Sequence, residues 1–214
     1  MTRSRLYPLD LPPASPGMTI GLYGGSFNPA HAGHRHVALT ALKHFQLDRI
    51  WCLVTPGNPL KDTKNLPSLE TRLEGTACMM DHPRIDVTGA EARAGTRFTA
   101  ETLEWLDKRT VGIRFIWIMG ADNLPQFHRW QRWQSILERI PVAIIDRPGH
   151  SLSALSSPAA LHYAWARLPS HKGAALARMK SPVWSFLHGP RSNLSSTYLR
   201  SNTTTQPNEV GQKP

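Results

Sequence analysis

Short apolar runs alternate with stretches of helical periodicity along most of the chain. Apolar runs of strand length occupy residues 19–23, 49–55, 85–88, 114–119, 142–145 and 183–187. Helical patterns occupy residues 33–45, 68–80, 99–108, 135–139, 195–201 and, less regularly, 158–168 and 172–180. Strands that alternate with helices form right-handed crossovers between parallel strands. The pattern therefore predicts an α/β fold, a doubly wound (Rossmann-like) parallel sheet flanked by helices.

The two ends of the chain lack this periodicity. Residues 1–17 are rich in proline, and we expect a flexible, extended leader there. Residues 202–214 are polar and poor in apolar side chains, so we expect a disordered tail. Between them, residues 18–201 are predicted to form a single domain, because 214 residues are enough for one substantial core.

Polar clusters follow four of the predicted strands at their carboxyl ends. They come after Tyr23, Thr55, Met119 and Leu187. In a doubly wound parallel sheet, ligands bind outside the carboxyl ends of the strands. The sequence therefore predicts a binding site at this edge of the sheet.

The first of these clusters, residues 23–36, reads YGGSFNPAHAGHRH. Gly24 and Gly25 have no Cβ, so we expect them to let the backbone turn tightly and approach a ligand. The helix that follows would point its unpaired N–H groups and its positive dipole end at the same place. His31 and His34 add imidazoles, and the cluster is therefore predicted to bind phosphate.

Several motifs of other protein classes are absent. No GxGxxG follows the first strand, no GxxxxGK[ST] occurs, and no HExxH or Cys/His set indicates zinc. His31, His34 and His36 could be read as a metal cluster, but their spacing within a turn fits no common zinc pattern. We therefore predict no protein-bound metal, no redox dinucleotide and no P-loop chemistry.

The composition is that of a cationic globular protein. Hydrophobic residues make up 40% of the chain and seven residues are tryptophan, which excludes a disordered protein. The net charge is +10, and residues 147–200 contain seven Lys or Arg and no Asp or Glu. Such a basic face attracts nucleic acid, anionic lipid or a polyphosphate ligand, although a solvated surface explains the same charges.

The sequence favours a cytoplasmic location. Cys52 and Cys78 form no CxxC pair, and nothing suggests a disulfide framework, so a reducing compartment is the simpler interpretation. No apolar run reaches the roughly 18 residues that a membrane helix needs. Residues 1–17 also lack the apolar core of a signal peptide.

Four motifs in this order resemble those of one enzyme family. The string GGSFNPAHAGH, with an HxGH spacing, resembles the nucleotidylyltransferase superfamily and, within it, bacterial nicotinate-nucleotide adenylyltransferase. Phosphopantetheine adenylyltransferases carry a similar string. Further along, PLK is similar to the family's PHK, GAD with a tryptophan eight residues later matches its GxD…W arrangement, and SSTYLR matches its SSTxxR motif.

The resemblance implies an ATP site built from the Gly-rich turn, the end of the central strand and the SSTxxR motif. Its residues would be Gly24, Gly25, Ser26, Phe27, His34, Gly120, Asp122, Ser196, Thr197 and Arg200. In the family, the aspartate binds the adenosine ribose, and the SSTxxR residues, which include Ser195 here, bind the leaving pyrophosphate.

The resemblance also implies a site for nicotinate mononucleotide. Its residues would be Asn28, Lys61, Thr99, Trp130 and Gln131. Trp130 would stack on the nicotinate ring, and the backbone N–H of Gln131 would meet its carboxylate. Two neighbours depart from the family pattern, because Leu60 stands in place of His and Phe98 in place of Tyr. Arg72 and Arg147 match family positions only loosely and receive no role, although Arg147 could border the adenine.

These features together predict transfer of the adenylyl group of ATP to nicotinate mononucleotide, giving deamido-NAD and pyrophosphate. The phosphate of the mononucleotide is itself the nucleophile, so the enzyme needs only to position it and stabilise charge. The catalytic residues would be His31, His34, Lys61 and Arg200. Mg²⁺ would bind mainly through the ATP phosphates, with few protein ligands.

Other readings of the sequence stay open. The acceptor could be nicotinamide mononucleotide or phosphopantetheine, because the HxGH chemistry is shared. The charge alone would also suit a basic nucleic-acid-binding protein, which leaves the ordered motifs unexplained. We expect ATP and nicotinate mononucleotide as partners, allow for a homo-oligomer, and expect neither nucleic acid nor a membrane.

Overall fold

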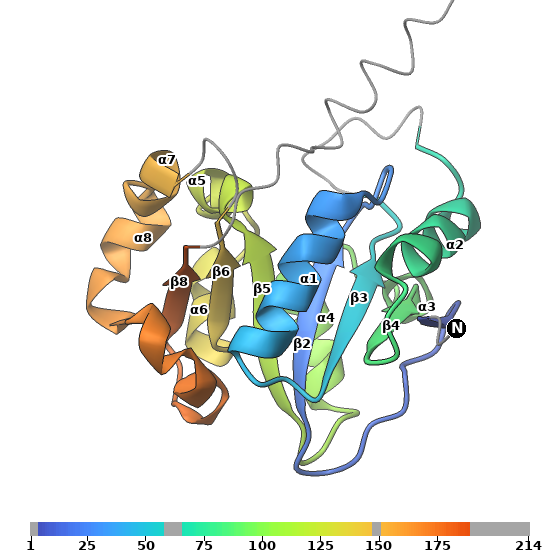
Figure 1. Cartoon of the computed structure of the whole chain (residues 1–214), viewed down its shortest axis with the longest axis horizontal. Helices are drawn as coiled ribbons and strands as arrows, with labels where there is room; N and C mark the ends of the chain where they lie inside the picture. The colour runs from blue at the N-terminus through green and yellow to red at the C-terminus, as the bar shows by residue number, and fades with distance from the viewer. Residues whose placement is uncertain (1–3, 58–65, 147–150, 189–214) are drawn as a thin grey trace, which may run out of the picture.

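A single parallel sheet of eight strands forms the centre of the protein in a computed structural model (Figure 1). The structure describes residues 4–57, 66–146 and 151–188. All strand pairs are parallel, in the order β1-β4-β3-β2-β5-β6-β8-β7. The strands are β1 Arg5–Tyr7, β2 Thr19–Gly25, β3 Arg49–Val54, β4 Ile85–Thr88, β5 Arg114–Gly120, β6 Val142–Ile145, β7 Arg167–Leu168 and β8 Trp184–Leu187.

The strand order reverses at the centre of the sheet. From β2 the chain moves outward through β3 to β4, then returns to place β5 on the other side of β2. The carboxyl ends of β2 and β5 therefore form the topological switch point, which is where doubly wound sheets bind ligands. The predicted fold class is confirmed, and the run at 114–119 is a central strand, as expected.

Helices cover both faces of the sheet. They are α1 Ala32–His44, α2 Leu69–Met80, α3 Ala90–Ala94, α4 Thr99–Asp107, η1 Ala121–Asn123, α5 Leu124–Phe127, α6 Trp133–Arg139, α7 Ser151–Leu155, α8 Pro158–His162, η2 Ala164–Ala166 and η3 Ser170–Arg178. In Figure 1, α1 crosses the near face of the sheet and α4 lies behind it. Among the helices that the structure describes, none is long and apolar enough to span a membrane.

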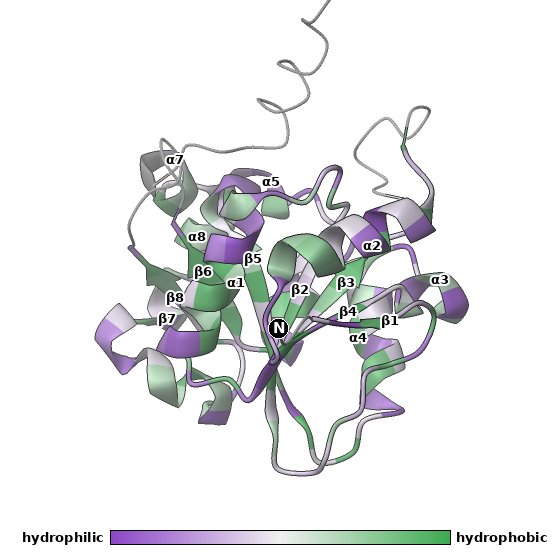
Figure 2. Ribbon diagram, turned by 45° about the vertical axis from the view of Figure 1, so that its right-hand side comes forward, coloured by the Kyte–Doolittle hydropathy of each residue, from purple (hydrophilic) through white to green (hydrophobic). Residues whose placement is uncertain are grey.

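Two hydrophobic layers hold the helices on the sheet. Because side chains alternate along a strand, Ile20 and Leu22 of β2 enter the layer under α4 to α6, while Tyr23 enters the layer under α1 and α2. The same alternation divides Trp117 from Ile118 on β5. Figure 2 shows the hydrophobic residues gathered in the strands at the centre. This packing fixes the first turn of α1 above the carboxyl end of β2.

The leader contributes to the sheet. Arg5–Tyr7 forms β1, which pairs in parallel with β4 at the edge. The Thr88 hydroxyl donates a hydrogen bond to the Asp10 carbonyl at 2.6 Å, and Leu11 packs against the core. Within the described residues 4–17, these contacts correct the expectation of a flexible leader over 1–17, because the segment gains both a strand partner and apolar contacts.

The last third of the described chain is less helical than predicted. The pattern at 158–168 becomes α8, η2 and the two-residue strand β7, and the pattern at 172–180 becomes the 3-10 helix η3. The close packing of Gly173 explains part of this, since a Cβ there would lie 2.5 Å from the His44 ring. The short helix α3 was not predicted. The predicted helix at 195–201 and the predicted tail lie outside the described residues.

Candidate active site

The phosphate turn, residues 26–31, joins β2 to α1. His31 is the N-cap of α1 and is buried, with 2% of its surface exposed. Its Nδ1 accepts a hydrogen bond from the Gly33 N–H at 3.1 Å, and Nδ1 of His34 accepts one from the His31 N–H at 3.3 Å. The two imidazoles thus form a reciprocal capping box, a role that Ser or Thr and Glu usually perform.

This capping box fixes the chemistry of both rings. When Nδ1 accepts a hydrogen bond, a neutral imidazole carries its proton on Nε2, so Nε2–H is the donor of each ring. The ring centroids of His31 and His34 lie 4.0 Å apart. His31 therefore uses its ring to order the start of α1, which is a role that the sequence did not reveal.

The glycines before the phosphate turn serve packing rather than turning. Gly24 and Gly25 are the last residues of β2, and neither has a positive φ angle. A Cβ on Gly24 would lie 2.6 Å from the Trp117 ring, so any side chain there would displace that ring. The expected tight turn occurs instead around Phe27, whose φ is 45° and whose buried ring packs edge-on to Tyr23 at 5.5 Å.

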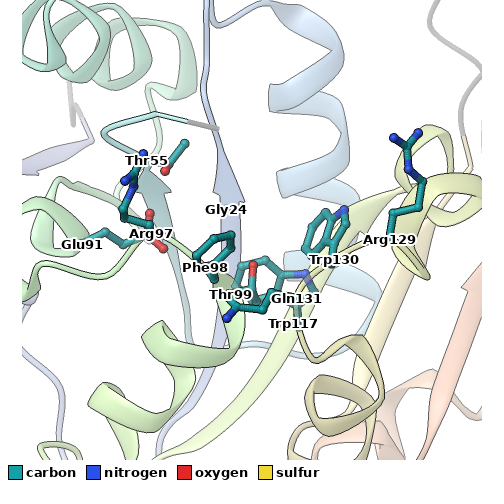
Figure 3. A pocket seen from close by; sticks show the side chains of 10 residues that line it. All are labelled: Gly24, Thr55, Glu91, Arg97, Phe98, Thr99, Trp117, Arg129, Trp130 and Gln131. Carbon is teal, nitrogen blue, oxygen red and sulfur yellow. The ribbon is translucent and has the colours of Figure 1, made fainter. Parts of the chain in front are cut away.

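A pocket opens beside the carboxyl ends of β2 and β5, and it brings four predicted residues together (Figure 3). The predicted residues are Gly24, Thr99, Trp130 and Gln131. The space measures about 770 Å³, part of it open to solvent. Six further residues line it, namely Thr55, Glu91, Arg97, Phe98, Trp117 and Arg129.

Trp130 forms one wall of this pocket. Its ring packs edge-on to Trp117 at 6.4 Å and to Phe127 at 5.1 Å, and the ring is only partly buried. These contacts hold an indole beside the open space, where it can stack on a planar ligand. Trp130 lines the pocket, whereas Trp133 does not. The Trp133 ring packs against Phe127 and Tyr163 instead.

Glu91 lies at the other end of the pocket, beside Thr55 and Arg97 (Figure 3). Its buried carboxylate accepts a hydrogen bond from the Thr102 hydroxyl at 2.8 Å. Burial raises the pKa of Glu91 to about 7, although hydrogen bonds from Thr102 and Thr55 oppose the shift. Glu91 is not among the site residues predicted from the sequence. The signal was available, because Glu91 follows the predicted strand at 85–88 closely, at its carboxyl end.

The end of β5 lies next to the phosphate turn, because β5 pairs directly with β2. Gly120 is the last residue of β5 and the N-cap of η1, and Asp122 is half-buried within η1. The predicted ribose-binding residue and the predicted phosphate-binding turn therefore come from neighbouring strands. Their spacing suits a nucleotide that spans the switch point.

Several predicted residues lie outside the described part of the chain. They are Lys61, Ser195, Ser196, Thr197, Arg200 and Arg147. The remaining turn residues, Ser26, Phe27 and Asn28, lie between β2 and α1. The described site thus consists of the phosphate turn, the end of β5 and the pocket at Trp130.

Comparison with known proteins gives the family. The sequence model of the cytidylyltransferase-like family matches residues 22–202. A protein of Methylorubrum extorquens, named "Probable nicotinate-nucleotide adenylyltransferase", is 56% identical over 183 residues, which cover 86% of this chain and 99% of that protein. The chain belongs to the nicotinate-nucleotide adenylyltransferases. A relative of the same name from Mesorhizobium japonicum is 50% identical over 190 residues, 89% of this chain and 97% of the relative.

Solved structures with the same fold support the architecture. The nicotinic acid mononucleotide adenylyltransferase of Plasmodium falciparum, complexed with APC, has a TM-score of 0.65 at 16% identity and covers 86% of this chain and 83% of its own. The same protein complexed with NaAD has a TM-score of 0.62 over the same shares. At this identity the likeness carries the nicotinate-nucleotide adenylyltransferase fold, and the residues of the site are argued from this chain alone.

Proposed function

We propose that this protein transfers the adenylyl group of ATP to nicotinate mononucleotide, giving deamido-NAD and pyrophosphate in NAD biosynthesis. The observation that carries the proposal is the pocket that joins Trp130, Thr99 and Gln131 to Gly24, next to the phosphate turn. The pocket has an aromatic wall, and the chain continues from Gly24 through the phosphate turn to the N-terminus of α1, so the two together suit a nucleotide with a planar base and a phosphate. The names of the relatives point to the same reaction.

The acceptor would lie with its nicotinate ring against Trp130. Trp117 and Phe127 pack edge-on against that indole, so its orientation is fixed before the ligand binds. This lowers the entropic cost of binding. Gln131 would offer its backbone N–H to the carboxylate. Arg97 and Arg129, both exposed at the pocket, add positive charge that favours an anionic acceptor.

The chemistry is an in-line displacement at the α-phosphorus of ATP. An oxygen of the mononucleotide phosphate forms a bond to that phosphorus while the bond to the bridging oxygen breaks, and pyrophosphate leaves with the electron pair. No covalent intermediate with the protein is needed. His34, Lys61 and Arg200 would stabilise the charge on the transferring and leaving phosphates, and His31 would keep the turn and His34 in place.

Mg²⁺ would enter this site with ATP. Within the described ranges, no group of three or more His, Cys, Asp or Glu side chains is arranged to hold a metal ion. A magnesium ion held mainly by the ATP phosphates would need few protein ligands, because Mg²⁺ keeps several of its waters. Its bound charge would oppose the negative charge that develops on the leaving pyrophosphate.

Three further expectations stay predictions. A cytoplasmic location fits the free cysteines, with Cys52 buried and Cys78 exposed. A homo-oligomer is allowed for, and no nucleic-acid partner is expected, because nucleic-acid binding would leave the ordered motifs unexplained. Mobility-shift titration with random duplex DNA and light scattering of the purified protein test them.

The proposed function is tested by measuring pyrophosphate release with ATP, Mg²⁺ and each of three acceptors. We expect nicotinate mononucleotide to be strongly preferred over nicotinamide mononucleotide and phosphopantetheine. Preference for the amide would keep the mechanism but overturn the role given to the pocket. Release with none of the three, from folded protein that binds ATP, would contradict the proposed acceptor class.

The assignment of Arg200 is tested by substitution. We expect Arg200→Ala to lower kcat by on the order of 100-fold, the scale of losing one preorganised charge donor at a transition state. The far-UV circular dichroism spectrum should stay that of the wild type, because the change removes a ligand contact. If folded Arg200→Ala protein turns over like the wild type, the role assigned to Arg200 is wrong.

A further inference from the structure

Arg72 is a buried cation that faces backbone carbonyls. It lies in the first turn of α2, and only 4% of its surface is exposed. Its Nε–H donates to the Pro67 carbonyl at 3.0 Å, and Nη1 donates to the carbonyls of Ser26 at 3.0 Å and Thr55 at 2.7 Å. Nη2 donates to the Pro56 carbonyl at 3.3 Å. Four of the five N–H groups of the guanidinium thus have partners in the described chain.

These four carbonyls belong to three separate segments. Ser26 lies in the phosphate turn, Thr55 and Pro56 follow β3, and Pro67 precedes α2. The guanidinium therefore holds both flanks of the segment 57–66 and joins them to the phosphate turn. That segment contains Lys61.

The start of α2 also has a cap of its own. Ser68 caps α2 by accepting a hydrogen bond from the Thr71 N–H at 3.1 Å, while Leu73 and Met80 bury the apolar face. Burial lowers the pKa of Arg72, which means that desolvation of the charge is unfavourable. Hydrogen bonds to a charged donor are worth more than neutral ones, and these offset the cost. What the protein gains is a fixed distance between segments that are far apart in the sequence.

We propose that Arg72 is a positioning residue, which fixes the phosphate turn relative to the flanks of segment 57–66 and so sets the phosphate side of the active site. The inference rests on the proposed adenylyl transfer. Arg72 touches neither substrate, and it acts through the backbone of Ser26, Thr55 and Pro56. Phosphoryl and adenylyl transfer depend chiefly on alignment, so a small displacement of the turn costs rate.

Lysine cannot replace this arginine. A guanidinium presents its N–H groups in a rigid planar fork, whereas an ammonium group is a single point on a flexible stem. Arg72→Lys keeps the positive charge and the aliphatic stem but cannot reach carbonyls on three segments at once. The variant therefore separates the geometry of the donors from their charge.

The experiment compares Arg72→Lys with Arg84→Lys as the matched control. Arg84 also donates to a backbone carbonyl, that of Leu47 at 3.3 Å, but just before β4, where the strands begin. For both variants and the wild type we would measure kcat, KM for each substrate, and ATP binding by calorimetry. Binding of nicotinate mononucleotide would be followed by tryptophan fluorescence.

We expect Arg72→Lys to lower kcat by on the order of 100-fold, the cost of roughly 1 Å of misplacement, and to weaken ATP binding. Binding of nicotinate mononucleotide should weaken less than that of ATP, because its ring would lie against Trp130, on the connection between α5 and α6, to which Arg72 does not bond. Its expected contacts with Asn28 and Lys61 would account for the part that is lost. Hydrogen exchange should rise at residues 24–28 and 55–57 but not at 128–131. Arg84→Lys should match the wild type in all of these measurements.

Two results would overturn the proposal. The first is wild-type kcat and ATP affinity in folded Arg72→Lys protein. The second is an equal loss of binding signal for both substrates together with unchanged KM values. An unstable protein with fewer active molecules would give that result. If Arg72→Lys does not fold, Arg72→Gln is tested in its place, by comparing its effect on kcat and ATP binding with its effect on binding of nicotinate mononucleotide. ATP binding is measured without turnover, so it does not depend on the acceptor. If nicotinate mononucleotide is not the acceptor, the wild-type enzyme will already fail to use it, whereas the comparison of ATP binding between Arg72→Lys and the wild type stays valid.

Discussion

Trp130 is the residue on which we propose that the nicotinate ring of the acceptor stacks. Its indole is held edge-on by Trp117 and Phe127, so it presents a ring to the pocket without needing a ligand to order it. A braced aromatic ring loses little conformational freedom on binding, and its stacking contribution is retained as affinity. The same bracing means that Trp130 also contributes to the core, so substitutions must separate binding from stability.

We predict that Trp130→Ala raises KM for nicotinate mononucleotide by on the order of 10-fold or more, the scale of one lost stacking contact. Trp130→Phe retains a ring and should stay within about threefold of the wild type. KM for ATP should be unchanged in both, as measured by pyrophosphate release. Trp165→Phe, at a tryptophan that is 73% exposed, is the control and should have no effect. An equal rise of both KM values in Trp130→Ala would contradict the assignment.

Glu91 couples the pocket to the pH dependence of stability. Its carboxyl group is buried and hydrogen-bonded to Thr102, and burial raises its pKa from 4.5 to about 7. An acid with a raised folded-state pKa stabilises the fold most below its unfolded pKa, and this stability is lost as the pH rises to the folded pKa. The contribution of Glu91 therefore falls between pH 4.5 and about pH 7 and stays low above it.

We predict that Glu91→Gln unfolds at higher urea concentration than the wild type at pH 8 but not at pH 4.5. The amide still accepts a hydrogen bond from Thr102 and cannot ionise, so the gain at pH 8 should approach about 3 kcal/mol at most. Urea titrations followed by circular dichroism at both pH values measure it. A difference between the two proteins that does not change with pH would show that Glu91 keeps an ordinary pKa.

At the scale of elements, one ion pair ties two strands together on the edge half of the sheet. Arg49 on β3 donates to the carboxylate of Asp86 on β4, with Nη2 to Oδ1 at 2.7 Å, and the Asp86 side chain is fully buried. β1 lies next to β4 at this edge of the sheet. In the sequence, β4 is followed by α3, which contains Glu91. The Arg49–Asp86 pair therefore supports the strand that positions one end of the pocket.

We predict that Asp86→Asn lowers the free energy of unfolding by about 3 kcal/mol, since it removes the charge of a fully buried carboxylate and leaves Arg49, whose side chain is 19% exposed, without its counter-charge. Urea unfolding measures the change. Glu104→Gln removes a partner of Arg132 in an exposed pair and is the matched control, with no measurable change in unfolding midpoint expected. Equal behaviour of the two variants would show that burial of Asp86 adds nothing.

At the scale of the whole molecule, the net charge of +10 suits a protein whose substrates are polyanions. We predict that KM for ATP rises several-fold as salt is raised from about 0.05 M to about 0.3 M, because screening weakens attraction over distances beyond about 10 Å. The value of kcat should change less, since the contacts within the site are close. Steady-state kinetics in a series of salt concentrations tests this prediction. A KM for ATP that does not change with salt would mean that the excess positive charge does not help to attract ATP.

Much of the fold could be predicted because its determinants are local in the sequence. Apolar runs predicted the strands at 85–88 and 142–145 with correct bounds, and the helical pattern at 68–80 matches α2 with its N-cap Ser68. The order of strands and helices, together with the handedness of crossovers, was enough for the doubly wound architecture. The motifs that resemble the family also needed no coordinates. Lys61, Ser196, Thr197 and Arg200 remain predictions from that resemblance.

Only the tertiary structure decided which distant residues meet. The hydrogen bond from Arg72 to Ser26 spans 46 positions, and the pairing of β1 with β4 brings the leader to a strand some 80 residues later. The environment of Glu91 also depends on the fold, because its carboxylate accepts hydrogen bonds from Thr55, which follows β3, and from Thr102 of α4. Periodicity reports the burial of a position but carries no information about its partner. The sequence by itself therefore determined most of the elements and the family, while long-range contacts decided how the phosphate turn, the leader and the pocket are held.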